Sequence, residues 1–269
     1  MKISGSTVLI TGPCGGIGGA IARQLAQRGA SLILVDRNSD RLETLAIELT
    51  TLGAKFVVPL AGDISASNIP ARLVQDALSH VEAIDILINC AGVQNFGFFT
   101  DETPAETATL FNVNTIAPIA LVNAVLPHML KNGKGQIVNL GSIFGSIGFP
   151  CFATYSASKY ALRGFSEALR RELAGSGVGV TYVAPRFTKT AFNRSVVTRM
   201  ADALKMNQDE PENVAASVIA AIERDGLDSY LGWPEKLFVR INSILPRLVD
   251  QSLIKQVSQM RPFATERTI

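Results

Sequence analysis

The stretch STVLITGPCGGIGGAIARQLAQRG, residues 6–29, decides the fold of this protein. It opens with a short β-branched apolar run, 6–11, and continues after the glycines with apolar residues at helical spacing. At the junction, Gly12, Gly16 and Gly18 let the backbone approach a pyrophosphate closely. The helix N-terminus then offers unpaired N–H groups and a partial positive charge to that anion. The stretch therefore predicts a strand–loop–helix unit that binds the phosphates of a dinucleotide.

The same alternation of strand-like and helical segments continues along the chain. The strand-like runs are 31–36, 55–60, 84–89, 135–140, 178–183 and 229–233, and the helical stretches are 39–52, 68–80, 105–130, 153–174 and 211–225. Because most of these runs are apolar at consecutive positions, they are typical of a parallel sheet covered by helices on both faces. Right-handed crossovers between such strands predict a single doubly wound α/β domain over residues 1–233.

Composition and charge exclude several other classes of protein. The chain has 269 residues with 25 Lys+Arg against 23 Asp+Glu, a net charge of +2, which leaves no basic stripe for nucleic acid. Its three cysteines form no CxxC pair and its two histidines lie far apart, so neither a disulfide framework nor a metal site is expected. The N-terminus is too polar before its first apolar run for a signal peptide, and no uninterrupted apolar stretch reaches the ~18 residues of a membrane span. We therefore expect a cytoplasmic protein whose partner is a small molecule.

The last segment, 234–269, departs from this alternation and is interpreted as a helical C-terminal extension. Apolar residues recur at helical spacing from Leu237 to Leu248, and Pro246 is expected to break or kink the helix. Residues 235–261 carry five Lys or Arg against two Asp or Glu, a net charge of +3. The extension is interpreted as a lid over a pocket, a subunit contact or an amphipathic helix on a membrane surface. Pro246 and the modest charge favour the first two interpretations.

Asp36 ends the second strand-like run, about 20 residues after the glycine loop. A carboxylate at that position binds the adenosine ribose hydroxyls and repels a 2′-phosphate, so it favours NAD. Arg37 follows directly and leaves NADP open, because its guanidinium can hold such a phosphate. The alternative interpretation is that both residues belong to a solvated turn.

A second constellation consists of Ser142, Tyr155 and Lys159. Tyr155 and Lys159 are four residues apart, so they share one face of the predicted helix. An ammonium beside a phenol favours the phenolate and is expected to lower the tyrosine pKa from ~10 toward the working range. Such a tyrosine can exchange a proton with an alcohol or carbonyl oxygen. Ser142 follows a strand at its carboxyl end, where its hydroxyl can bind the reacting oxygen.

Together these motifs resemble the short-chain dehydrogenase/reductase family over about residues 5–232. The matching motifs are TGPCGGIG (11–18), GDI (62–64), NCAG (89–92), Asn114 in FNVNT, Ser142 and YSASK (155–159). The resemblance implies a Rossmann-type fold, a nicotinamide dinucleotide cofactor and a tetrad of Asn114, Ser142, Tyr155 and Lys159. It gives Tyr155 the role of general acid/base, has Ser142 polarise the substrate oxygen and has Lys159 hold the nicotinamide ribose. Asn114 is expected to fix a water that relays protons to Lys159. The family likeness also implies a homodimer or homotetramer.

The resemblance further implies which residues contact the cofactor. They are Gly12, Cys14, Gly15, Gly16, Ile17 and Gly18 in the loop, Asp36 and Arg37 at the ribose, Asp63 and Ile64 at the adenine, Asn89, Ala91 and Gly92 along the ribose, Tyr155 and Lys159, and Pro185, Thr188 and Thr190 beside the nicotinamide. NADP-preferring members often carry a basic residue where this chain has Gly15, which again favours NAD. Cys14, near a helix N-terminus, is interpreted as a small filler residue rather than a redox-sensing thiol.

One departure from the family pattern follows Pro185, where Arg186 replaces a common glycine. At a pocket rim this cation is expected to contact an anionic or polar substrate group, or else to point into solvent. The predicted substrate pocket comprises Gln94, Phe144, Phe149, Phe152 and Arg186.

The aromatic residues around the predicted site indicate a lipophilic substrate. The leading hypothesis is an NAD(P)-dependent oxidoreductase that interconverts a secondary alcohol and a ketone. Within that class, a 3-oxoacyl-type reductase and a steroid- or lipid-type hydroxy dehydrogenase both stay open. The alternative is a non-catalytic dinucleotide-binding or redox-sensing protein on the same fold, which the complete tetrad disfavours.

Overall fold

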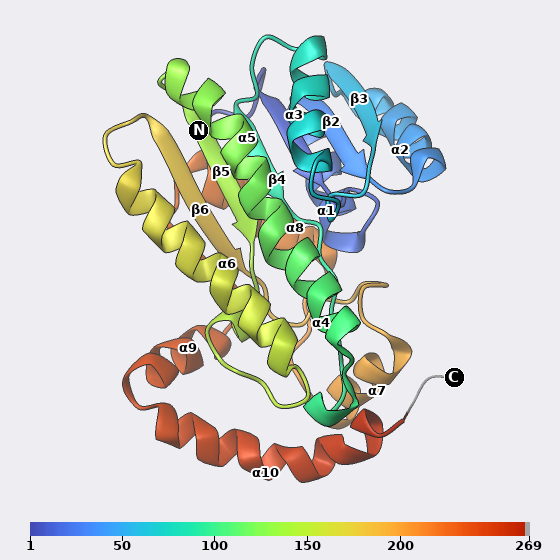
Figure 1. Ribbon diagram of the computed structural model, residues 1–269, viewed down its shortest axis with the longest axis vertical. Helices are drawn as coiled ribbons and strands as arrows, with labels where there is room; N and C mark the ends of the chain where they lie inside the picture. The colour runs from blue at the N-terminus through green and yellow to red at the C-terminus, as the bar shows by residue number, and fades with distance from the viewer. Residues whose placement is uncertain (267–269) are drawn as a thin grey trace.

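The computed structural model describes residues 1–266 and contains a seven-stranded sheet in the order β3-β2-β1-β4-β5-β6-β7 (Figure 1). The strands are β1 (Thr7–Thr11), β2 (Ser31–Asp36), β3 (Phe56–Ala61), β4 (Ile86–Asn89), β5 (Gly135–Leu140), β6 (Val178–Ala184) and β7 (Asp228–Tyr230). All neighbouring strands run parallel. The chain builds outward from β1 to β3 and then returns to the other side of β1. The predicted doubly wound sheet is confirmed, and ligands of such sheets bind where the strand order reverses.

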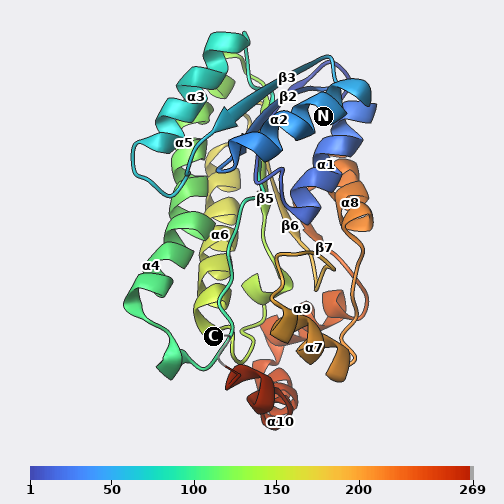
Figure 2. The same ribbon diagram turned by 90° about the vertical axis from the view of Figure 1, so that its right-hand side faces the viewer.

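Helices cover both faces of the sheet (Figure 2). One face carries α1 (Gly16–Gln27), α2 (Ser39–Thr51) and α8 (Pro211–Glu223), and the other carries α3 (Ile69–His80), α5 (Ala117–Lys131) and α6 (Ala153–Glu172). Successive residues of a strand face opposite sides. In β1, Val8 and Ile10 accordingly enter one apolar core while Leu9 enters the other. This is why the strand-like runs are apolar throughout.

Helix α5 continues a shorter helix, α4 (Pro104–Phe111), through the π-helical turn Asn112–Ile116. By length and composition alone, Pro104–Lys131 is the one stretch of the described residues that could cross a membrane. Leu121, Val125 and Met129 on this helix are buried in the core that it shares with α3 and the sheet. We therefore assign the helix to the helical layer of the fold.

Three further helices lie beyond the carboxyl ends of the strands, at the lower end of Figure 1. They are α7 (Ser195–Ala203), α9 (Glu235–Ile244) and α10 (Pro246–Ala264). Pro246 is the first residue of α10 and separates it from α9, which confirms the predicted break. Short 3-10 turns occur at Phe99–Asp101 and Ile143–Gly145. The sequence interpretation missed α7, although its buried residues recur at helical spacing.

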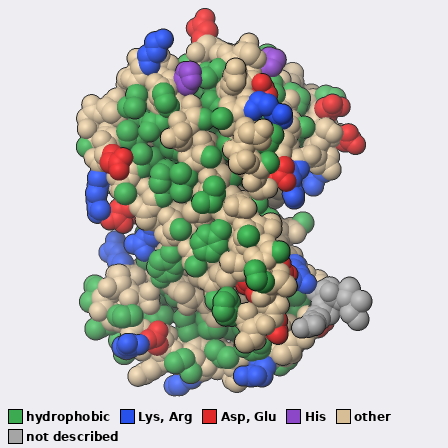
Figure 3. All heavy atoms as spheres, viewed as in Figure 1, with side chains coloured by type: hydrophobic (Ala, Val, Ile, Leu, Met, Phe, Trp, Pro, Cys, Tyr) green, Lys and Arg blue, Asp and Glu red, His purple; other side chains and the backbone are tan. Residues whose placement is uncertain are grey.

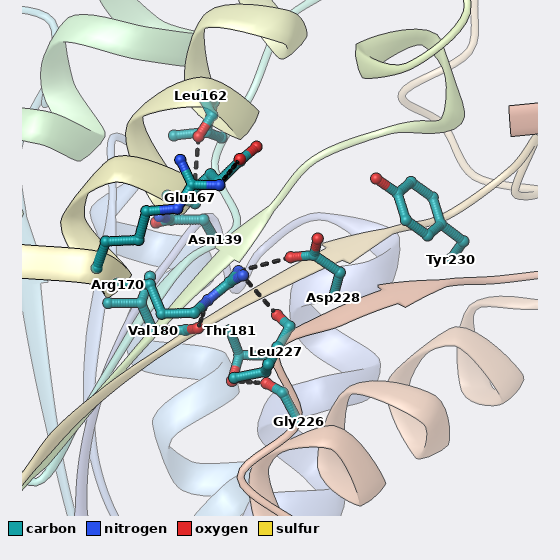
Figure 4. Close-up of polar contacts among 12 residues, drawn as sticks. Asn139, Leu162, Glu167, Arg170, Val180, Thr181, Gly226, Leu227, Asp228 and Tyr230 are labelled. Atoms are coloured by element: carbon teal, nitrogen blue, oxygen red, sulfur yellow. Dashed lines mark hydrogen bonds and ion pairs between the residues drawn. The ribbon is translucent and has the colours of Figure 1, made fainter. Parts of the chain in front are cut away.

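The edge strand β7 is short and is held by side chains from its neighbours (Figure 4). Arg170 on α6 donates to the carbonyls of Val180 and Leu227 and pairs with Asp228. Thr181 on β6 donates to the Gly226 carbonyl at 2.6 Å. These contacts fix the edge of the sheet from which the chain leads into α9.

Candidate active site

The loop between β1 and α1 has no room for side chains at its glycines. Gly12 has a φ of +71°, and a Cβ there would lie 2.8 Å from the Cα of Ala91 in the loop after β4. A Cβ on Gly18 would collide with the carbonyl oxygen of Gly12. Helix α1 begins at Gly16 with no side-chain cap from the described residues. Its first turn therefore directs uncapped N–H groups and a partial positive charge into the cavity that it lines.

That cavity has a volume of about 1430 Å³ and extends from the glycine loop, past the strand ends, to α9 and α10. All of the predicted cofactor residues line it except Asn89. The predicted pocket residues Gln94, Phe144, Phe149, Phe152 and Arg186 line it too. Cofactor and substrate positions predicted from separate motifs thus share one cavity.

At the end of β2, backbone N–H groups orient the Asp36 carboxylate. Its Oδ2 accepts from the Cys14 N–H at 3.2 Å, and its Oδ1 accepts from the Arg37 N–H at 2.8 Å. Burial, and next the nearby Asp36 carboxylate, raise the pKa of the Cys14 thiol to about 11. This thiol is therefore protonated at neutral pH.

The two residues predicted at the adenine line the cavity, whereas Asn89, predicted along the ribose, lies elsewhere. Asp63 and Ile64 line the cavity, and Asp63 accepts hydrogen bonds from the backbone and the hydroxyl of Ser65. Asn89 is 2% exposed, and its side-chain nitrogen donates to Asn139 at 2.9 Å. Its Oδ1 is buried without a hydrogen-bond partner among the described residues. The structure therefore buries Asn89 between strands, outside the cavity lining in which it was predicted.

Asn114 lies in the π-helical turn, fully buried, and clamps the loop after β4. Its Oδ1 accepts from the Val93 N–H at 2.9 Å, and its Nδ2 donates to the Val93 carbonyl at 2.8 Å and to the Ser158 hydroxyl at 3.1 Å. Both amide hydrogens are thereby used. Asn114 Nδ2 therefore has no hydrogen left to donate to the water that Asn114 was expected to hold.

Tyr155 and Lys159 project from the first turns of α6 and are both buried. Ser142, at the end of β5, hydrogen-bonds with Tyr155 and accepts from the Phe144 N–H at 3.1 Å. Lys159 donates to the Leu140 carbonyl at 3.0 Å, and its Nζ lies 5.9 Å from the centroid of the Tyr155 ring. The end of β5 and the start of α6 thus bring the hydroxyls of Ser142 and Tyr155 together, as predicted.

The electrostatics of this pair differ from the prediction. Burial raises the pKa of Tyr155 to about 12, outweighing the lowering effect of its hydrogen bond with Ser142. Burial likewise lowers the pKa of Lys159 to about 8. The expected lowering of the tyrosine pKa by the ammonium is therefore wrong for this structure. Desolvation dominates, because the ammonium lies beside the ring face and donates to a backbone carbonyl.

The segment after β6 forms one side of the cavity. Pro185, Thr188 and Thr190 line it, and the Thr188 hydroxyl donates to the Arg186 carbonyl at 3.1 Å. Gln94 Nε2 donates to the Phe192 carbonyl at 3.1 Å and to Asn193 Oδ1 at 3.0 Å. Gln94 is therefore a bridge between the loops after β4 and β6.

The Arg186 side chain is held by two carboxylates. It was predicted to contact a substrate group or to point into solvent. It forms a bidentate pair with Asp209 at 2.8 and 3.0 Å and contacts Glu235 of α9 at 3.0 Å. All three side chains are less than one-fifth exposed. The predicted contact with an anionic substrate group is thus not favoured, because the charge of Arg186 is already matched.

Aromatic side chains form the wall next to Tyr155. The rings of Phe144 and Phe149 are stacked with centroids 4.5 Å apart, and Phe152 lies 5.2 Å from Phe144. Phe144 and Phe152 each meet the Tyr155 ring edge-on at 6.3 Å.

Helices α7, α9 and α10 complete the wall with side chains that the sequence interpretation did not assign to the site. Those lining residues are Val197, Met200, Phe238, Ile241, Leu248, Val249, Ser252, Leu253 and Gln256.

Comparisons with known proteins agree with this geometry. The family model "short chain dehydrogenase" matches residues 6–201. The chain belongs to the short-chain dehydrogenase family. It is 32% identical to the "Ketoacyl reductase HetN" of Nostoc sp. over 93% of this chain and 88% of the relative. It is 38% identical to an "11-beta-hydroxysteroid dehydrogenase-like" protein of Arabidopsis thaliana over 68% of this chain and 61% of the relative.

A solved short-chain dehydrogenase/reductase from Burkholderia phymatum, determined in complex with NAD, superposes with a TM-score of 0.84 at 25% identity, covering 93% of this chain and 96% of that one. This short-chain dehydrogenase is accordingly an NAD(P)-dependent oxidoreductase acting on CH–OH groups. Its residues fit a nicotinamide dinucleotide, since the uncapped α1 N-terminus, the tight glycine loop and the Asp36 carboxylate line the same cavity in that order.

Proposed function

We propose that this short-chain dehydrogenase prefers NAD and interconverts a secondary alcohol and a ketone on a lipophilic substrate. The observation that carries the proposal is the position of Tyr155. Its side chain hydrogen-bonds with Ser142, lines the same cavity as the glycine loop and packs against the aromatic wall. A substrate oxygen bound there meets two hydroxyls, while its carbon skeleton meets phenyl rings.

In the reductive direction, Tyr155 and Ser142 donate hydrogen bonds to the ketone oxygen. The bound cofactor supplies the hydride that the carbonyl carbon takes up. Tyr155, neutral at pH 7 because its pKa is about 12, then gives its proton to the developing alkoxide. The Lys159 cation beside the ring stabilises the resulting phenolate until it takes a proton from solvent. In the oxidative direction these proton steps reverse: Tyr155 first releases its proton to solvent, and the phenolate beside the Lys159 cation then takes the proton of the alcohol.

The preference for NAD rests on Asp36. Two backbone N–H groups hold its carboxylate at the end of β2, where a 2′-phosphate would meet a fixed negative charge. The neighbouring Arg41 is oriented by donating to the Cys14 carbonyl. The structural relative determined with NAD supports the same preference.

The lipophilic substrate rests on the apolar wall of the cavity. Phenylalanines line its inner end and leucine, isoleucine and valine side chains of the last two helices line its outer end. The names of two relatives, a ketoacyl reductase and a hydroxysteroid dehydrogenase-like protein, support a ketone on a lipid-like skeleton.

A screen of ketones and alcohols with NAD(H) and NADP(H), read at the absorbance of the reduced nicotinamide, tests the proposal. We expect turnover of lipophilic substrates, with NAD(H) preferred. Tyr155→Phe is expected to lower that turnover by about 10²–10⁴-fold and to leave NADH affinity nearly unchanged.

The alternative, a non-catalytic dinucleotide-binding protein, predicts NADH binding with no turnover and no effect of Tyr155→Phe. Asp36→Asn tests the cofactor preference separately, because removing the carboxylate is expected to improve NADPH binding relative to NADH at least about tenfold. If the ratio of NADPH affinity to NADH affinity is the same in Asp36→Asn as in the wild type, Asp36 does not select the cofactor.

A further inference from the structure

Large apolar side chains are exposed from the start of α9 to the first turn of α10. Trp233 is 69% exposed and Ile244 is 76% exposed, and Leu237, Phe238, Leu245 and Leu248 are also exposed. We call these six side chains the tail patch. Leu237 and Ile244 lie on one face of α9 at helical spacing, and Leu245 and Leu248 continue that surface into α10. Such a concentration of apolar side chains on a surface marks an interaction site.

Cations are interleaved in the sequence with the residues of the tail patch. Lys236, Arg240 and Lys255 form no salt bridge with the described residues, whereas Asp250 is paired with Arg247 and Glu235 with Arg186. At the lower left of Figure 3, green side chains lie together with blue ones and a red one. The free charge of this surface is therefore positive.

Two side chains of the tail patch also lie at the edge of the catalytic cavity. Phe238 and Leu248 are exposed to solvent and line the cavity as well, and Ile241 lies between them on the lining. A side chain that is both in the wall and on the surface marks the mouth of a cavity. The mouth of this one therefore opens within the patch.

From these observations we propose that the α9–α10 turn docks this enzyme on an anionic lipid bilayer, with the mouth of the cavity facing the lipid. Apolar side chains that enter the interface, together with cations at headgroup level, are the features of a helix that lies on a membrane. Pro246 does not oppose this arrangement, because it creates the turn at which Ile244 and Leu245 are presented.

A second copy of the chain fits the patch less well. In a two-fold contact each patch would meet its own copy, and unpaired cations would face cations. An anionic headgroup layer instead matches the free positive charge. A lipid bilayer is also a reservoir from which a lipophilic ketone can enter the cavity directly; that consequence rests on the proposed function, while the docking does not.

Co-sedimentation of the full chain with vesicles tests the proposal, using phosphatidylcholine alone and phosphatidylcholine mixed with phosphatidylglycerol. We expect binding to the mixed vesicles that weakens as salt is raised. The double variant Ile244→Glu/Leu245→Glu changes two exposed residues that do not line the cavity, and its binding is expected to fall at least about tenfold. Lys236→Gln/Arg240→Gln is expected to lose about as much and to show a weaker salt dependence.

The matched control is Ile47→Glu/Leu227→Glu, which places two glutamates on exposed apolar positions remote from α9 and α10, 72% and 61% exposed. This control is expected to bind vesicles like the wild type. Equal partition of the wild type and Ile244→Glu/Leu245→Glu overturns the proposal. So does absence of vesicle binding together with a dimer that this variant dissociates, since the patch is then a subunit contact.

Turnover of a water-soluble ketone is measured in the same samples to separate this inference from the proposed function. We expect all variants to turn it over at the wild-type rate, because none of the changed residues lines the cavity. If even the wild type shows no turnover with any substrate, the proposed function fails while vesicle binding still decides the docking.

Discussion

The two ends of the catalytic cavity are built in different ways. The end at β1, β2 and β4 is made mainly of backbone: glycines in close contact, an uncapped helix N-terminus and a carboxylate held by two N–H groups. The end at α7, α9 and α10 is made of apolar side chains from segments far apart in the sequence. We call them the cofactor end and the tail end. Backbone geometry demands particular residues at fixed spacing, whereas apolar packing accepts many residues, so only the cofactor end is written as a motif.

The largest effect is expected for Gly18→Ala at the cofactor end. The new Cβ collides with the carbonyl oxygen of Gly12, and neither backbone can yield without opening the phosphate loop. We expect an affinity for NADH at least about 100-fold lower and a free energy of unfolding about 3 kcal/mol lower. Fluorescence titration and urea unfolding measure the two effects.

Gly164→Ala is the matched control. Gly164 lies in α6 with open space around its Cα, so the added methyl is expected to raise the free energy of unfolding by about 0.5–1 kcal/mol. Unchanged NADH affinity in Gly18→Ala would contradict the role assigned to the tight loop.

The two ends also differ in how far the sequence alone could predict them. The glycine loop, Ser142, Tyr155 and Lys159 were placed correctly in one cavity, because strand ends and helix starts at fixed spacing determine them. Asn89 was misplaced, since only the buried amide chain to Asn139 shows which way it points.

The contacts of Arg186 at the tail end could not be predicted, for a similar reason. Arg186 meets Asp209 and Glu235, which are 23 and 49 residues away, and no local pattern links them. Helix α7 could have been predicted from the sequence, because Val196, Val197 and Met200 recur at helical spacing. The expected cytoplasmic location and homo-oligomeric state stay predictions.

The buried ammonium at the cofactor end predicts a pH dependence of stability. The pKa of Lys159 falls from 10.5 to about 8 on folding. Below pH 8 the lysine is charged in both states, and its burial destabilises the native one. Between pH 8 and 10.5 the native lysine is neutral while the unfolded one still binds a proton, so the free energy of unfolding rises with pH.

Lys159→Met isolates this contribution. Subtracting its free energy of unfolding from that of the wild type removes the opposing contributions of Tyr155 and the cysteines, whose pKa values are raised. We expect this difference, wild type minus Lys159→Met, to increase by on the order of 3 kcal/mol between pH 7 and pH 10.5. Urea unfolding at a series of pH values measures it, and a constant difference would mean that Lys159 is not desolvated.

At the tail end, Arg186→Met is expected to break the only ion pair that the described residues form between the segment after β6 and α9. It leaves Asp209 and Glu235, each 19% exposed, without their shared cation. We expect the free energy of unfolding to fall by about 2–3 kcal/mol and KM for the lipophilic substrate to rise, with the Kd for NADH within about twofold of the wild type.

Lys189→Met is the control on the same segment. Its ion pair with Glu210 is 53% exposed on both sides, so its loss is expected to leave the free energy of unfolding nearly unchanged. If NADH binding weakens as much as substrate binding in Arg186→Met, the separation of the two ends is not real.

The smallest expected effect concerns the end of α7. Lys205 follows this helix with a φ of +51°, a conformation that glycine adopts without strain, and it forms no ion pair with the described residues. Lys205→Gly is therefore expected to raise the free energy of unfolding by about 0.5–1 kcal/mol.

Asp225 follows α8 with the same φ but pairs with the N-terminal ammonium of Met1. Asp225→Gly relieves the same strain and loses that pair, so its gain in stability should be smaller than that of Lys205→Gly. Thermal denaturation of both variants measures the two gains. If both variants gain equally, the ion pair contributes nothing; if neither gains, the strain at the end of α7 is absorbed by the packing of the tail end.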